Sequence, residues 1–284
     1  MSETGWNQVV RFVTLLIHRY LRHRVGVQSA ALAFYLLFML FPFLIFISAL
    51  LGMLQLNVAA VLGAVEEFLP REVLEVLARY LNHVGETPNP RLMFFGLVFS
   101  VYFPMRATNT LMRAVRTACH LGPPRNTVRH ILKTLLYTGL LMVTIMLTLV
   151  LTTVSDRLLA YGVQQFRLPV LVAQLWTALR FPLIGTVGFF ALLLLYALAQ
   201  DVRQPWKNLW PGTLTALGVW LGLSWAYTWY VEHVAHYSLL YGSIGAVIVL
   251  LIWLNMTAVV LIMGAEWNGV WMGLRKEQLA GGRI

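Results

Sequence analysis

The chain alternates long apolar intervals with short segments that carry nearly all of its charge. Because a helix needs about 20 apolar residues to cross a hydrocarbon core of about 30 Å, each long charge-free interval predicts one transmembrane helix. The intervals predict six spans, at about residues 28–54, 91–110, 134–155, 178–200, 208–231 and 241–265. The pattern therefore predicts an all-α integral membrane protein with six transmembrane helices, in which residues 1–284 form a single membrane domain.

The second interval is the shortest of the six, because Pro104 and Arg106 interrupt it. We expect this helix to start near Arg91, bend at Pro104 and continue as an amphipathic stretch towards Cys119. A re-entrant segment is the alternative, although it would leave an odd number of crossings.

Two stretches outside the predicted spans repeat apolar residues at helical spacing. The first, at about residues 4–23, sets an apolar face against a basic one and lacks a signal-peptide cleavage site. It predicts an N-terminal interfacial helix that lies on the membrane surface and is retained. The second, at about residues 57–84, is divided by Pro70 between acidic patches and predicts short amphipathic helices on the outer side.

Composition and charge sharpen this picture. The chain is 59% hydrophobic and 11% charged, which excludes an ordinary water-soluble domain. Its net charge is +10, and most of the 21 Lys and Arg residues fall in segments that would be cytoplasmic if both termini lie inside. The basic excess then faces anionic inner-leaflet lipid, so nucleic acid is not an expected partner.

Glu266 is the most conspicuous ionisable residue. The whole stretch from His233 to Ala265 lacks Asp, Glu, Lys and Arg, so this carboxylate is expected near the inner end of the last span. Charge at that depth is costly and marks a functional candidate. We expect Glu266 to pair with Arg106, either as a salt bridge that locks two helices or as part of a substrate or proton pathway. Arg106 and Asn109 could contact a phosphate group, and snorkelling of Arg106 from a helix end is the alternative.

Several uncharged residues are further candidates. Pro42, in the middle of the first span, could form a hinge or simply shape helix packing. Gln28, Tyr35 and Asn255 could line a pathway, and hydrogen bonds between helices are the alternative. Small residues that favour close helix packing, within the chain or between protomers, are Gly212, Gly218, Gly222, Gly242, Gly245 and Gly264.

Three segments carry a family resemblance. They are Ser29-Ala-Ala-Leu-Ala-Phe-Tyr35 with Leu40-Phe-Pro42, Pro205-Trp-Lys-Asn-Leu-Trp-Pro-Gly212, and Tyr241-Gly-Ser-Ile-Gly245 continued to Gly264-Ala-Glu266. From about Arg19 to Gly269 the sequence resembles the YihY/BrkB family of bacterial inner-membrane proteins. It departs from the family pattern at Val101-Tyr-Phe-Pro-Met105, where small and hydroxyl residues are usual.

The resemblance implies a six-span protein of the cytoplasmic membrane. Some members are linked to serum resistance, a virulence trait, and to export of lipopolysaccharide intermediates, and members were long labelled ribonuclease BN. Metal-dependent cleavage of a phosphodiester needs clustered His and Asp ligands. The only aspartates, Asp156 and Asp201, lie on opposite predicted sides of the membrane. We therefore expect no ribonuclease, no catalytic residue, no metal site and no cofactor.

These observations favour a transporter or flippase-like protein for an amphipathic substrate, with the lipid identity implied by the resemblance alone. Membrane lipids, a lipopolysaccharide or other lipid-linked envelope precursor, and a second copy of the chain are the expected partners. No ATP-binding motif is present, so transport would be passive, ion-coupled or partner-driven, with Glu266 as the coupling candidate. A scaffold for envelope assembly is the alternative. An enzyme acting on lipid phosphates, using His120 or His130, is a third.

Overall fold

The computed structural model describes residues 5–53, 90–124, 126–166, 170–200, 205–233 and 243–281. Within these ranges the fold is entirely helical, with seven α-helices, one short 3-10 helix and no strand. The prediction of an all-α protein is confirmed to that extent. The helices predicted at residues 57–84 and the candidate Gly242 lie outside the described residues.

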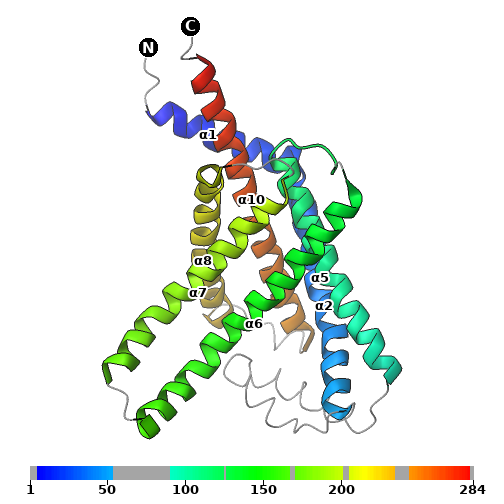
Figure 1. Cartoon of the computed structure of the whole chain (residues 1–284). Helices are drawn as coiled ribbons and strands as arrows, with labels where there is room; N and C mark the ends of the chain where they lie inside the picture. The colour runs from blue at the N-terminus through cyan, green and yellow to red at the C-terminus, as the bar shows by residue number, and fades with distance from the viewer. Residues whose placement is uncertain are drawn as a thin grey trace. The chain divides into compact units, whose positions relative to one another are not determined.

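Within the described residues, helices cover the stretches where the six spans and the N-terminal surface helix were predicted (Figure 1). In chain order they are α1 (Gly5–Arg22), α2 (Val25–Met53), α5 (Pro90–Ala118), α6 (Thr127–Phe166), α7 (Val170–Leu198), the 3-10 helix η1 (Trp206–Asn208), α8 (Trp210–His233) and α10 (Ser243–Gly281).

Three of these helices run well past the apolar intervals that predicted them. α5 continues through Pro104 to Ala118, α6 is 40 residues long, and α10 continues to Gly281. An α-helix satisfies its own backbone hydrogen bonds, so it need not stop where its surroundings become polar. The length of a charge-free interval therefore predicts how much of a helix is apolar enough for the hydrocarbon layer, and it does not predict the full length of the helix.

Two helices in the described ranges are long and apolar enough to cross a membrane. The qualifying segments are Val25–Phe46 of α2 and Val247–Arg275 of α10, and Pro182–Leu198 of α7 is a shorter apolar segment. The six crossings and the cytoplasmic position of both termini stay predictions.

The residues divide into two compact units, and the first holds the site described below. This first unit comprises residues 1–37, 105–138 and 189–284. α8 packs beside α10, and α1 lies across α10 (Figure 1). The fully buried side chains at its centre include Met112, Val115, Leu195, Tyr196 and Ile262.

The second unit comprises residues 38–104 and 139–188. Here α2 and α5 touch at Gly96, where an added Cβ would lie 2.7 Å from the backbone nitrogen of Phe46 and 2.9 Å from the carbonyl oxygen of Pro42. α2 remains helical through the buried Pro42. Pro42 thus lies at a helix contact, which agrees with the packing alternative for this residue.

Candidate functional site

Glu266 lies in the apolar segment of α10 and has no solvent-exposed surface. Its Oε1 atom is 2.5 Å from Nδ1 of His23, and its Oε2 atom is 3.4 Å from Nη1 of Arg19. Both partners are themselves nearly buried, with side-chain exposures of 14% for Arg19 and 10% for His23. A buried carboxylate of this kind is tolerated when charged and hydrogen-bonding groups surround it.

The end of α1 brings both partners to the same side. The backbone N–H of His23 donates to the carbonyl of Arg19, so the two residues are one helical turn apart. Arg24 then adopts a positive φ of 52° and turns the chain into α2. Gln28 donates its side-chain amide to the carbonyl of His23 at 2.7 Å, which satisfies an otherwise unpaired group at the helix end.

The end of α5 completes the site. His120 has a φ of 54°, and Leu121 N–H donates to the carbonyl of Arg116, which is the Schellman arrangement of a helix C-terminus. This turn presents two acceptors to Arg19: the carbonyl of Ala118 and Nε2 of His120, each at 2.9 Å. We call Arg19, His23, His120 and Glu266 the charged cluster.

A close approach of α10 holds the charged cluster together. A Cβ added at Gly269 would lie 2.8 Å from Nη1 of Arg19 and would collide with the carbonyl oxygen of Ala118. Only glycine at this position lets the arginine and the end of α5 reach the surface of α10.

Two pKa values are shifted at the charged cluster, that of its member His120 and that of the adjacent Cys119. Partial burial lowers the pKa of His120, and the charges of Arg19 and His23 lower it further. His120 is therefore neutral at pH 7, as an acceptor from Arg19 requires. Burial also raises the pKa of the Cys119 thiol from 9.0 to about 12, with the negative charge of Glu266 adding to the rise. Cys119 is thus an inert thiol at neutral pH.

Arg106 and Asn109 lie away from the charged cluster. Arg106 stacks on the ring of Tyr35 with 5.6 Å between guanidinium carbon and ring centroid, and its Nη2 is 3.4 Å from the tyrosine hydroxyl. Asn109 Oδ1 is 2.9 Å from Nε2 of His130. The expected partnership of Arg106 with Glu266 is therefore wrong. Ala118 contacts the charged cluster through its carbonyl group, and Arg106 lies twelve residues before it in the same helix. At 1.5 Å per residue, Arg106 is therefore about 18 Å away along the helix axis.

The predicted packing glycines differ in their surroundings. A Cβ at Gly212 would clash with Asn268 and with the backbone of Gly264, and one at Gly264 would lie 2.6 Å from Cβ of Ala216. α8 and α10 therefore cross closely at this pair. Gly218 and Gly222 face open space, and Gly245 is buried in α10.

Asn268 is a buried residue that the sequence analysis missed. Its Oδ1 accepts a 2.7 Å bond from the backbone N–H of Gly212, and its Nδ2 donates to the carbonyl of Leu209 at 2.8 Å. One amide thereby caps the start of α8 from α10. By contrast, the Oδ1 atom of Asn255 is buried and has no hydrogen-bond partner among the described residues.

Two basic residues, Arg116 and Lys133, bond to the carbonyl groups at the end of a helix. Arg116 is 5% exposed and donates to the carbonyl of Ala199 at 3.1 Å, and Lys133 donates to Leu198 and Gln200 carbonyls at 3.3 Å. Cations at a helix C-terminus satisfy its last carbonyls and interact favourably with its dipole. Part of the basic charge that sequence analysis assigned to the lipid surface therefore stabilises the end of α7.

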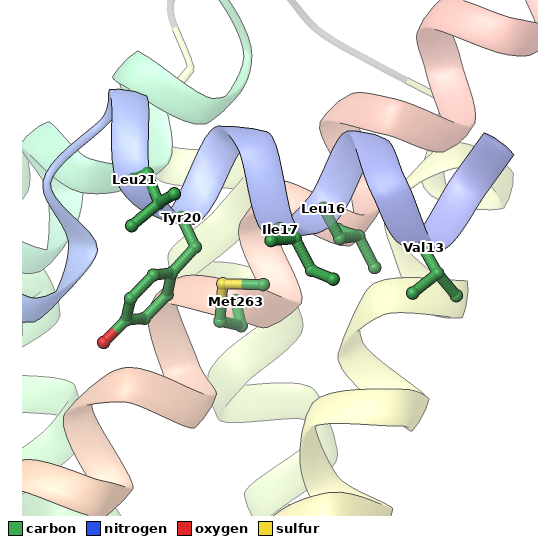
Figure 2. Close-up of a pocket in the computed structure, with 6 residues that line it drawn as sticks. All are labelled: Val13, Leu16, Ile17, Tyr20, Leu21 and Met263. Carbon is green, nitrogen blue, oxygen red and sulfur yellow. The ribbon is translucent and has the colours of Figure 1, made fainter. Parts of the chain in front are cut away.

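An apolar groove of about 380 Å³ runs between α1 and α10, beside the charged cluster. Figure 2 shows its side chains projecting from one side of α1 towards Met263. We call it the α1 groove, and its lining residues are Val13, Leu16, Ile17, Tyr20, Leu21 and Met263. Met263 lies one helical turn before Glu266, so apolar and charged surfaces adjoin along the same part of α10.

A second apolar groove, of about 350 Å³, lies between α8 and α10. It is lined by Leu223, Ala226, Tyr227, Tyr230, Ile252 and Met256. Among the residues that the structure describes, no three His, Cys, Asp or Glu side chains are grouped so that they could hold a metal ion.

Comparison with known proteins identifies relatives along nearly the whole chain. It is 27% identical over 262 residues to the ribonuclease-like protein YfkH of Bacillus subtilis (strain 168), covering 91% of this chain and 94% of that protein. It is 24% identical to a UPF0761 membrane protein of Chromohalobacter salexigens, covering 95% of this chain and 65% of the relative. A UPF0761 membrane protein of Pelodictyon phaeoclathratiforme is 23% identical, with 90% and 59% covered.

The chain thus spans less than two thirds of the length of these two UPF0761 relatives. No solved structure matches it. The family model described as "Virulence factor BrkB" matches residues 16–281, which hold every residue of the charged cluster. The chain therefore belongs to the BrkB (YihY) family and is a membrane protein of that family.

Proposed function

We propose that this membrane protein moves an amphipathic, lipid-type substrate, as a transporter or flippase-like protein. The observation that carries the proposal is the adjacency of the α1 groove and the charged cluster, one helical turn apart on α10. A lipid needs both an apolar surface for its chains and a polar region for its headgroup. Such a site is typical of an amphipathic ligand and not of a water-soluble one.

The pair formed by His23 and Glu266 is the coupling element in this proposal. A proton shared between an imidazole and a buried carboxylate can be lost or gained as its surroundings change. Protonation of Glu266 would remove the charge that holds Arg19, and would weaken the attachment of α1 to α10. Movement of α1 would then open the α1 groove as the proton moves.

The proposed setting is the bacterial cytoplasmic membrane, with six crossings and both termini inside. The bias of Lys and Arg towards the inner segments supports that orientation. A lipopolysaccharide or other lipid-linked envelope precursor is the substrate class that the family resemblance suggests. The open glycines Gly218 and Gly222 of α8 would suit contact with a second copy of the chain.

A specific observation favours the scaffold as the second candidate. Both oxygens of Glu266 already have partners, and the two grooves described above are apolar. A scaffold would use the charged cluster only to lock α1 against α10. It would tolerate replacement of Glu266 as long as the protein still folds.

Reconstitution distinguishes the two candidates. Full-length protein is placed in vesicles that carry a fluorescent phospholipid, and quencher is added outside with and without an imposed pH gradient. We expect wild type to expose inner-leaflet lipid faster than empty vesicles, and Glu266→Gln to lose that activity at equal protein abundance. Glu277→Gln is the matched control, because it makes the same change in an exposed ion pair with Arg11. Equal activity of wild type, Glu266→Gln and empty vesicles would reject transport of phospholipid.

A further inference from the structure

The α1 groove has the form of a discrete lipid site. We infer that it binds one acyl chain of an anionic phospholipid from the leaflet on which α1 lies. This inference rests on the proposed position of α1 at the membrane surface, and does not depend on transport.

The lining of the α1 groove suits a hydrocarbon chain. Five of its six side chains are aliphatic or thioether, and the sixth is Tyr20. Val13, Ile17 and Leu21 stay 47%, 59% and 70% exposed, so the protein leaves this apolar surface uncovered. Its volume of about 380 Å³ falls within the range of small-ligand sites.

The exposed apolar face of α1 extends beyond the groove. Val9 and Val10 are 56% and 48% exposed and continue the same side of the helix. By helical spacing, Arg11 and Arg22 fall on the other side of α1. A basic amphipathic helix with an uncovered apolar face rests in the lipid headgroup region with that face towards the acyl chains. A membrane lipid is therefore the occupant that fits this groove.

The charge around the groove selects an anionic headgroup. α1 contains no Asp or Glu. Arg11 and Arg19 are engaged with Glu277 and Glu266, whereas Arg22 and Arg24 make no ion pair with any described residue. Both arginines follow Leu21 at the end of α1, and their long side chains can reach a phosphate at headgroup level.

The test measures binding of single lipids to the purified full-length protein by native mass spectrometry. Phosphatidylglycerol and phosphatidylcholine of equal chain length are added separately. We expect one phosphatidylglycerol to be retained with about tenfold or greater preference over phosphatidylcholine, since each basic residue near a membrane favours anionic lipid. Replacing Arg22 and Arg24 together by Gln should abolish the preference and leave binding at the phosphatidylcholine level.

Filling the groove tests the position of the chain. Ile17→Trp should lower phosphatidylglycerol retention about tenfold, while Val10→Trp, at a similarly exposed position of α1 outside the groove, should not. If Ile17→Trp fails to fold, Val13→Trp replaces it, because Val13 is a second exposed residue of the groove and its replacement should lower phosphatidylglycerol retention in the same way. Unchanged binding in a folded groove variant, or equal binding of the two lipids to wild type, would overturn the inference. Retained binding by a Glu266→Gln variant that fails to transport would separate this site from the proposed function.

Discussion

Replacing Glu266 by Gln removes the negative charge of the charged cluster while nearly preserving its shape. The glutamine carbonyl can still accept from His23, but its amide nitrogen would then face Arg19, donor against donor. Arg19 would keep its bonds to Ala118 and His120 and lose the one carboxylate that pairs with it among the described residues. The variant therefore tests how much the buried charge contributes to the free energy of unfolding, separately from the volume of the side chain.

The structure sets the expected magnitude. Removing one partner of a buried ion pair costs about 3–5 kcal/mol, because the other charge stays buried without compensation. Here the Arg19 contact is long, at 3.4 Å, and one hydrogen bond to His23 survives, so we expect a loss of about 2–4 kcal/mol. In Glu277→Gln the affected side chains are 53% and 63% exposed, and solvent screening limits the loss to about 0–1 kcal/mol.

Both variants are measured by unfolding the purified protein in mixed micelles with increasing sodium dodecyl sulfate, followed by circular dichroism. The free energy of unfolding is compared at a common detergent composition. A loss in Glu266→Gln no larger than that in Glu277→Gln would refute the argument that a buried charge pair attaches α1 to α10.

Three further predictions concern the surroundings of the site. Gly212→Ala should destabilise by about 1–3 kcal/mol in the same unfolding assay because its Cβ has no room, whereas Gly218→Ala should be neutral or stabilise by up to about 1 kcal/mol. Cys119 should react with a thiol-alkylating reagent about a thousandfold more slowly in folded than in unfolded protein at pH 7, because its pKa is raised to about 12; equal rates would contradict the raised pKa of this half-buried thiol. The pKa of His120 is lowered when folded, so the unfolded chain takes up its proton first and stability should fall as the pH drops below 6.5. Melting temperatures between pH 7.5 and 5.5 should fall less in His120→Asn, which keeps an acceptor for Arg19 and tolerates a positive φ.

Helix positions follow closely from the sequence because the distribution of apolar residues along the chain largely sets them. The surface helix predicted at residues 4–23 is Gly5–Arg22, and the span predicted at 208–231 lies in Trp210–His233. In both cases the apolar pattern changes where the helix ends. It does not change at the end of α5, whose last turns are buried against protein and carry Arg116 with them. The span predicted at residues 91–110 therefore covers only part of the helix, and the expected continuation towards Cys119 is confirmed, since α5 ends at Ala118.

The site could be predicted only in part. The cost of a charge in an apolar segment identifies Glu266 without knowledge of the fold. Its partners depend on two turns, at Arg24 and His120, where residues other than glycine adopt a positive φ. Neither turn has a glycine at the position of positive φ to mark it in the sequence, and without these turns Arg19 belongs simply to the basic face of a surface helix. The spacing of Arg19 and His23, four residues apart, was the available signal.

The glycines of α8 show the same limit more sharply. Gly212, Gly218 and Gly222 share one helix, yet only Gly212 meets a neighbour within the described residues. The difference lies on α10, where Gly264 allows the backbones to approach and Asn268, one turn later, bonds to the start of α8. A small residue permits contact, and a matching small residue and a polar anchor on the partner helix produce it. Spacing within one helix therefore identifies candidates, and the pairing of two helices decides among them.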